Sequence, residues 1–245
     1  FTNNIKSDVE AYIPEGSVLK QDNNGAVVVD GDMTAVARVD GIGFTDLAKA
    51  IAAADDGDTV TLEQDVTETT ISISEDKNIS LNLGGNTLNL TQFTNTDNLF
   101  GSSSFKAMFF NAGTLSIENG RIVLYNSTEA GSGIVNSGNM TLASDLDIDA
   151  NVMGEALINV DGSLTSYADI SNIVTTASSG WGGAITTYGG ILNLYGGSIT
   201  AEAAESAGSS LYMTGITVYN SEYDNESEGA EVTLSNVEVT ADVYA

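Results

Sequence analysis

The stretch Phe44-Thr-Asp-Leu-Ala-Lys-Ala-Ile-Ala-Ala-Ala-Asp-Asp-Gly-Asp-Thr-Val-Thr-Leu62 changes its hydrophobic period in the middle. Its first half predicts an amphipathic helix over residues 45–54, in which Thr45 caps the start and Asp46 suits the positive end. The apolar residues at helical spacing are Leu47, Ala48, Ile51 and Ala52. Its last residues alternate with period two, which is typical of a strand with one buried face. We therefore predict a short helix that covers one end of a stacked β structure.

The composition is strongly acidic. The 245 residues include 34 Asp and Glu against 7 Lys and Arg, which gives a formal net charge of −27, and there is neither Cys nor His. Because nucleic-acid phosphates and anionic membrane surfaces attract Lys and Arg, this charge argues against both as partners. No apolar run approaches the roughly 20 residues that cross a bilayer, so we expect no membrane insertion.

The chain begins at Phe1, and we expect a secretion signal to have been removed, which predicts a location outside the cell or at its surface. Residues 1–43 are predicted to form an N-terminal strand leader, or arm. Its short apolar segments are separated by turn residues such as Pro14-Glu-Gly16 and Asp30-Gly-Asp32. Residues 44–245 are predicted to form one further unit, made of the helix and the β structure.

A repeat is visible in the rest of the chain. Apolar residues alternate around a recurring glycine, and glycines 113, 138, 162, 190 and 215 are spaced by 25, 24, 28 and 25 residues. A period in the mid-twenties with three short strands per unit predicts an all-β parallel β-helix, or solenoid, of about seven turns that share one core. The alternative is an antiparallel sandwich with a hairpin about every 8–12 residues.

The run Val36-Ala-Arg-Val39-Asp-Gly-Ile-Gly-Phe44-Thr-Asp-Leu47-Ala-Lys-Ala50-Ile51-Ala-Ala-Ala54, followed by Gly57-Asp-Thr-Val60-Thr-Leu62, resembles the opening of right-handed parallel β-helix modules in exported proteins of anaerobic, often gut-dwelling, bacteria. Those modules are similar in fold to pectate lyases. The resemblance is closer over residues 36–90 and looser up to residue 245. It implies a right-handed β-helix and an exported bacterial origin, but not one function, because the fold carries adhesins, structural proteins and polysaccharide-cleaving enzymes.

The residue types do not favour catalysis, and we predict that the protein is not an enzyme. A pectate-lyase-like site would pair calcium-binding carboxylates with a basic group, yet Arg38 and Arg121 are the only arginines. We expect Arg121 to pair with the nearby Glu118. The acidic surface would also repel a polyanionic substrate. A polysaccharide lyase, or a hydrolase with two carboxylates, remains an alternative.

Three aspartates form the best candidate for a metal site. Asp145, Asp147 and Asp149 alternate with Leu146 and Ile148, so they would form one outward row on a strand. Their carboxylates would lie about 6–7 Å apart, where Ca²⁺ could bridge them. The alternative is a solvated acidic face, and we expect no other cofactor.

Aromatic residues suggest a contact surface. Trp181 lies in a loop of small residues, and tyrosines recur in the neighbouring repeats. Outward aromatic rings could stack on sugars or fill a protein interface, and the alternative is that they cover a loop or a sheet face. The candidate residues are Trp181, Tyr188, Tyr195, Tyr212 and Tyr219.

The ends of a strand stack leave unpaired backbone groups that soluble proteins cover. The helix would cover one end, but no polar helix or stop follows the last apolar alternation, at residues 232–239. An open last turn can accept a strand from the leader of a second copy. The residues predicted for this contact are Val9, Tyr12, Ile13, Val18 and Leu19 of the leader and Val237, Val239, Val243 and Tyr244 of the last turn.

These features predict a secreted or cell-surface bacterial structural protein. It would self-assemble head to tail with further copies into a filament or surface layer, or serve adhesion. The alternatives are an extracellular glycan-binding module, whose partners would be host or microbial glycans, and a polysaccharide lyase or hydrolase on the same scaffold.

Overall fold

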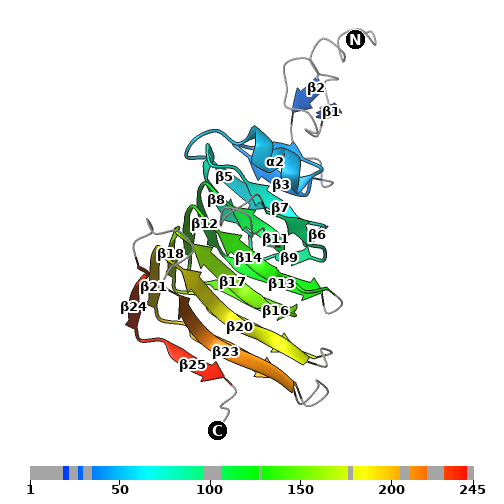
Figure 1. Cartoon of the computed structure of the whole chain (residues 1–245). Helices are drawn as coiled ribbons and strands as arrows, with labels where there is room; N and C mark the ends of the chain where they lie inside the picture. Colours follow the sequence, from blue (N-terminus) through cyan, green and yellow to red (C-terminus); the bar gives the residue numbers. More distant parts are fainter. Residues whose placement is uncertain are drawn as a thin grey trace.

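The computed structural model of the chain describes residues 35–96, 106–126, 129–175, 179–204, 210–219 and 229–241, together with the backbone of two short strands at 19–21 and 27–29. These residues are nearly all β and contain one α-helix. Within them, no helix has the length and apolar content that a bilayer crossing requires. The strands stack in layers from the helix towards the last strands (Figure 1).

Three long sheets contain almost all of the strands. The first sheet has the order β24-β21-β18-β15-β12-β8-β5-β3-β4. In chain order its strands are β3 (Ala37–Val39), β4 (Ile42–Phe44), β5 (Thr59–Leu62), β8 (Asn78–Asn82), β12 (Thr114–Glu118), β15 (Asn139–Leu142), β18 (Ser163–Ser166), β21 (Ile191–Tyr195) and β24 (Glu231–Ser235).

The second sheet has the order β25-β22-β19-β16-β13-β9-β6. Its strands are β6 (Val66–Glu68), β9 (Thr87–Leu90), β13 (Gly120–Asn126), β16 (Leu146–Val152), β19 (Asp169–Val174), β22 (Ser198–Ala203) and β25 (Glu238–Ala241). The third sheet has the order β10-β11-β14-β17-β20-β23, and β7 also pairs with β11. Its strands are β7 (Ile71–Ile73), β10 (Thr94–Asn95), β11 (Lys106–Asn111), β14 (Ser132–Asn136), β17 (Glu155–Val160), β20 (Ser179–Tyr188) and β23 (Ser210–Tyr219).

Successive passes of the chain visit the third, first and second sheets in the same order, from β11, β12 and β13 to β23, β24 and β25. Neighbouring strands of successive passes are parallel and in register, as where Leu164 lies beside Leu192. The antiparallel pairs of the described residues are β1–β2, β3–β4, β3–β5 and β10–β11. Long parallel sheets are compatible with a β-solenoid, and the antiparallel sandwich considered as the alternative is wrong.

The core lies between the three sheets and follows from the period-two alternation. On the first sheet the inward residues form a column in register, in which no member is more than 3% exposed. The column consists of Ile79, Leu115, Met140, Leu164 and Leu192. Burying one such side chain contributes about 1.5–3 kcal/mol, so the stacked columns supply the main stabilisation of the fold.

The predicted helix is present as α2 (Leu47–Ala53) and contacts β3, β4 and β5. Its N-cap is Asp46, whose carboxylate accepts a hydrogen bond of 3.0 Å from the backbone N–H of Lys49, so the expectation of a Thr45 cap is wrong. Its buried residues are Leu47, Ala50 and Ile51, whereas the predicted Ala48 and Ala52 are exposed. The buried face of the helix therefore differs from the predicted face by a rotation about the helix axis. It starts at Leu47 and continues at the positions three and four residues later.

The predicted leader is described in part. Residues 37–44 form β3 and β4 at the edge of the first sheet, and β3 pairs antiparallel with β5. Upstream, β1 (Leu19–Gln21) pairs antiparallel with β2 (Val27–Val29). Residues 35 and 36, which lead into β3, are also described, and Val36 donates its N–H to the carbonyl of Phe44 at 2.7 Å. The other leader residues lie outside the described part of the chain.

Candidate functional site

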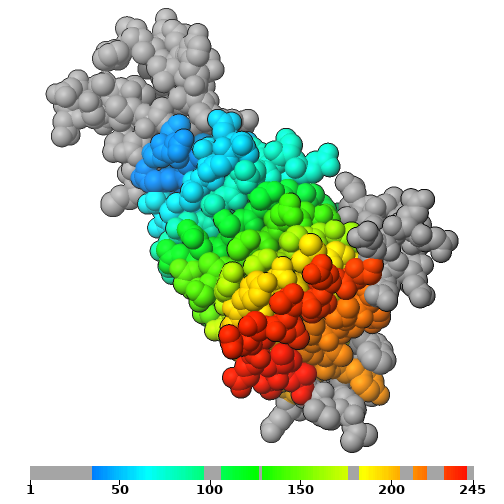
Figure 2. All heavy atoms as spheres, turned by 90° about the vertical axis from the view of Figure 1, so that its left-hand side faces the viewer, coloured from blue at the N-terminus to red at the C-terminus, as the bar shows by residue number. Residues whose placement is uncertain are grey.

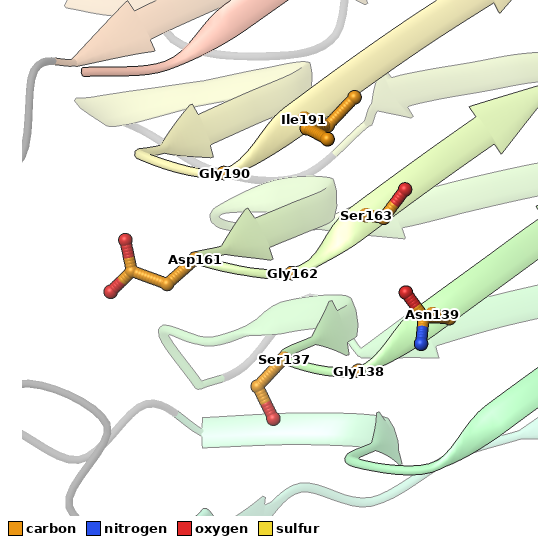
Figure 3. A pocket seen from close by; sticks show the side chains of 8 residues that line it. All are labelled: Ser137, Gly138, Asn139, Asp161, Gly162, Ser163, Gly190 and Ile191. Atoms are coloured by element: carbon orange, nitrogen blue, oxygen red, sulfur yellow. The ribbon is translucent and has the colours of Figure 1, made fainter. Parts of the chain in front are cut away.

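A groove of about 540 Å³ lies at the corner where the chain passes from the third sheet to the first. It extends over three successive passes, and Figure 3 shows the side chains that line it. The lining residues are Ser137, Gly138, Asn139, Asp161, Gly162, Ser163, Gly190 and Ile191.

A column of glycines forms the floor of this groove. Gly138, Gly162 and Gly190, three of the repeat glycines, lie one above another at the corner. A Cβ atom on Gly162 would lie 2.5 Å from the carbonyl oxygen of Gly138, and Gly190 has a φ of +65°. Close stacking of the corners therefore requires glycine and leaves a floor of bare backbone. Gly215 is not part of this column, because it lies inside β23.

Side chains stand on both sides of the glycine column (Figure 3). Asn139, Ser163 and Ile191 are in register at the first residues of β15, β18 and β21. Ile191 is 40% exposed. Ser137 and Asp161 point to the opposite side. The groove thus combines hydroxyl, amide and carboxylate groups with one apolar surface.

A buried asparagine ladder holds the corner from the inside. The amide of Asn111 donates to Asn136 Oδ1 at 2.7 Å, and the amide of Asn136 donates to Asn159 Oδ1 at 2.7 Å. Asn159 donates to Thr187 Oγ1 at 3.2 Å. Each of the three amides also donates to the carbonyl of the following glycine, at 3.1–3.2 Å. These bonds fix the backbone that forms the groove floor.

No prediction from the sequence included this ladder, although the sequence contains a signal for it. Each of the three asparagines precedes a repeat glycine by two or three residues, and all three are 0% exposed. Asparagine so close to glycine is normally assigned to a turn. Here each asparagine still belongs to its strand, at its last residue or the one before, and its side chain is buried in the core.

A second hollow, of about 320 Å³, lies on the outer face of the second sheet. The Arg121 guanidinium forms an ion pair with Asp149, which also accepts a hydrogen bond of 3.0 Å from Ser171 Oγ. The expected pairing of Arg121 with Glu118 is wrong, because parallel strands place Arg121 of β13 beside β16. Glu118 accepts a hydrogen bond from Asn82 instead.

The three aspartates of the candidate calcium site are placed as follows. Leu146 and Ile148 are buried, as the alternation requires, and Asp147 is exposed between them. Asp145 accepts a hydrogen bond of 3.0 Å from the backbone N–H of Asn119, and Asp149 is engaged by Arg121. In the part of the chain that the structure describes, no three or more acidic, Cys or His side chains are grouped closely enough to hold a metal ion.

Two pairs of tyrosine rings are in contact across neighbouring passes of the chain. The rings of Tyr188 and Tyr219 are stacked, with centroids 4.8 Å apart, at the ends of β20 and β23. Tyr195 lies 5.7 Å from Tyr167, a residue that the sequence analysis did not select. Tyr212 is 38% exposed on β23. The backbone of Trp181 pairs with that of Tyr212, and its side chain lies outside the described part.

The last pass of the chain exposes apolar residues that are buried in the pass before it. Leu234 of β24 is 53% exposed and its register partner Leu194 is 1% exposed. Val239 of β25 is 46% exposed and its partner Ile199 is 1% exposed. Val237, also predicted for assembly, is half-buried. Figure 2 shows residues 229–241 in red at the opposite end of the stack from α2 and β3 in blue.

The other residues predicted for assembly are described less fully. Leu19 lies in β1, where its backbone pairs with Val29 of β2. The remaining candidates lie outside the described residues, so their predicted role stays a prediction. They are Val9, Tyr12, Ile13, Val18, Val243 and Tyr244.

One largely buried acid lies on the third sheet. Glu155 of β17 accepts a hydrogen bond of 3.3 Å from Ser132 Oγ of the neighbouring β14. Burial raises the pKa of Glu155 above its ordinary value, and hydrogen bonds from its own backbone, Ser132 and Thr186 oppose that rise. The charged form of this side chain is therefore disfavoured by its surroundings.

Comparisons with family models, with curated proteins and with solved structures find no match to this chain. The architecture defines the class, which is an almost all-β protein of long parallel sheets. Its function must therefore be argued from its own surfaces.

Proposed function

We propose that the chain is a right-handed parallel β-helix capped by α2, and that it is a structural protein that self-assembles through its last turn. Further copies add head to tail and build a filament or a surface layer on the outside of a bacterial cell. The alternative role that we propose for the same surface is adhesion. The proposal assigns no reaction and no cofactor to the protein.

One observation carries this proposal: the core columns reach β24 and β25, where the described residues leave their apolar side chains exposed. Leu234 and Val239 continue the columns of Leu194 and Ile199, yet about half of each side chain is exposed. The backbones of β24 and β25 form the ends of their sheets. An exposed, apolar sheet edge is a template for a strand from another molecule.

The opposite end differs, which supports a directional contact. There α2 contacts β3, β4 and β5 and buries Leu47, Ala50 and Ile51. Two unlike ends favour a heterologous contact, which gives an open polymer when it does not close into a ring. We propose the leader, with residues 1–20, as the donor strand of the next copy.

The proposed location outside the cell rests on sequence features. The net charge of −27 suits an ion-rich medium that screens it, and residues 36–62 resemble the opening of exported β-helix modules.

Size measurement of the purified protein tests the proposal. We expect light scattering and negative-stain images to show polymers whose length increases with protein concentration. The double variant Leu234→Lys/Val239→Lys should remain monomeric, because two buried charges would oppose strand addition. Deletion of residues 1–20 should have the same effect.

The matched control is Ile173→Lys, which places one lysine at a 40% exposed apolar position in the middle of the second sheet. It should assemble like the unmodified chain. Monomers at every concentration, or unchanged assembly of the double variant, would exclude the proposed contact.

A further inference from the structure

The corner groove has a chemical character that neither the fold nor assembly explains. Its walls carry an amide on Asn139, a hydroxyl on Ser163 and an exposed apolar side chain on Ile191, one from each successive pass. Adjacent strands are about 4.8 Å apart, so these groups repeat along the stack at that interval. A ligand that matches them must be elongated and must lie along the stack.

The floor offers hydrogen-bond donors as well. Ser163 and Ile191 donate their N–H groups to the carbonyls of Gly138 and Gly162, both at 2.9 Å. The N–H groups of Gly138, Gly162 and Gly190 donate to no acceptor among the described residues. Gly162 is itself buried, and a buried N–H without an acceptor is rare in proteins. Because Gly162 is buried, a ligand in the groove would reach the side chains of Asn139 and Ser163 rather than this N–H.

The charge of the groove restricts the ligand further. Asp161 is the one charged side chain among the eight lining residues, and the molecule as a whole has a net charge of −27. A uronic acid, a phosphate or a sulfate would therefore be repelled. An added peptide strand needs an unpaired sheet edge, whereas β15 and β18 are paired on both sides.

We infer that this groove binds a neutral, linear polysaccharide that lies along the stack across three passes of the chain. Sugar hydroxyls would accept from the N–H groups of Gly138 and Gly190, which are half-buried, and would exchange hydrogen bonds with Asn139 and Ser163. The apolar face of one sugar ring would contact Ile191. Tyr188, two residues before the floor residue Gly190, stacks on Tyr219, and the pair would offer a further surface for ring contacts. This inference does not depend on assembly through the last turn.

Titration with neutral hexasaccharides tests the inference. The probes are the β-1,4-linked hexamers of glucose, N-acetylglucosamine, xylose and mannose, with a hexamer of galacturonic acid as the anionic comparison. We expect at least one neutral probe to bind in calorimetry and the anionic probe to bind more weakly or not at all. Absence of binding by every neutral probe at millimolar concentration, or preference for the anionic probe, would overturn the inference.

Two variants assign that binding to the groove. Ser163→Trp fills the groove from its wall and should abolish binding. Thr165→Trp lies two residues further on β18, is half-buried like Ser163 and does not line the groove, so it should bind normally. Asn139→Ala removes one amide and should weaken binding about five- to tenfold. Equal binding by Ser163→Trp and Thr165→Trp, at equal thermal stability, would place the sugar elsewhere and refute the assignment.

Discussion

Glu155 is the residue at which burial and charge conflict most directly. Burial raises its pKa above the ordinary value of 4.5, so the folded state holds the proton more tightly than the unfolded chain does. This favours folding below the ordinary pKa, and the contribution is lost as the pH rises through the higher pKa of the folded state. At neutral pH the buried carboxylate therefore lowers the free energy of unfolding.

Glu155→Gln should raise the unfolding temperature at pH 7 and leave it nearly unchanged at pH 4, because glutamine keeps the shape and never ionises. Thermal unfolding followed by circular dichroism over this pH range measures the difference. Glu75→Gln removes the same charge at an exposed turn position and serves as the control. A gain at pH 7 that is equal in both variants would show that net charge, rather than burial, is responsible.

At the scale of the elements, the asparagine ladder links four neighbouring strands and ends abruptly at β11. Asn111 Oδ1 is buried and has no hydrogen-bond partner among the described residues. The residue beside Asn111 on β7 is Ile73, which has no donor to offer. The ladder therefore stops with one unsatisfied acceptor, which costs about 1–3 kcal/mol.

Replacing Ile73 by asparagine should extend the ladder, because its amide could donate to Asn111 Oδ1 as each earlier amide donates to the next. Ile73→Asn should therefore destabilise the protein about 1–2 kcal/mol less than Ile71→Asn does. Ile71 is buried on the same strand and lies beside Phe109 rather than an asparagine, so it is the matched control. Urea unfolding measures both, and equal losses would contradict the proposed bond.

The elements also show how far sequence reasoning reaches in this chain. The strand stack was predictable from two signals. The alternation of apolar residues indicates the buried face, and glycines 113, 138, 162 and 190 indicate where the corners make close contact. The partner of Arg121 was not predictable, because Asp149 lies 28 residues further along the chain and only the register of the parallel strands brings it close. The helix face was misassigned for a simpler reason: an alanine-rich segment has several faces of similar hydrophobicity.

The candidate site was predictable to a smaller extent. The groove exists because glycines leave a gap between two rows of side chains, and a sequence shows the glycines but not the gap. The acidic row was recognised in the sequence, but the engagement of Asp145 by Asn119 and of Asp149 by Arg121 depends on neighbouring passes. Aromatic pairs likewise form between passes, which is why Tyr167 was missed.

At the scale of the whole molecule, acidic charge accumulates towards the last turn. No Lys or Arg follows Arg121, whereas 16 Asp and Glu do. Parallel register stacks some of these charges. Asp147 of β16 lies between Arg121 of β13 and Asp169 of β19, and the guanidinium of Arg121 forms its ion pair with Asp149. Like charges directly opposite in a sheet destabilise it, and salt reduces the effect because the screening length is about 10 Å at 0.1 M.

Neutralising Asp147 and neutralising Asp149 should therefore change the free energy of unfolding in opposite directions. Asp147→Asn relieves the repulsion from Asp169 and should raise the free energy of unfolding by about 0.2–1 kcal/mol at low salt. Asp149→Asn breaks the ion pair with Arg121 and should lower it by about 0.2–1 kcal/mol. Both effects should shrink when urea unfolding is repeated at high NaCl.

A comparison of CaCl₂ with NaCl at equal ionic strength distinguishes repulsion from calcium binding. If CaCl₂ stabilises the unmodified chain more than NaCl does, and Asp147→Asn removes this difference, Asp147 holds a calcium ion. Equal stabilisation by the two salts is the result that repulsion alone requires.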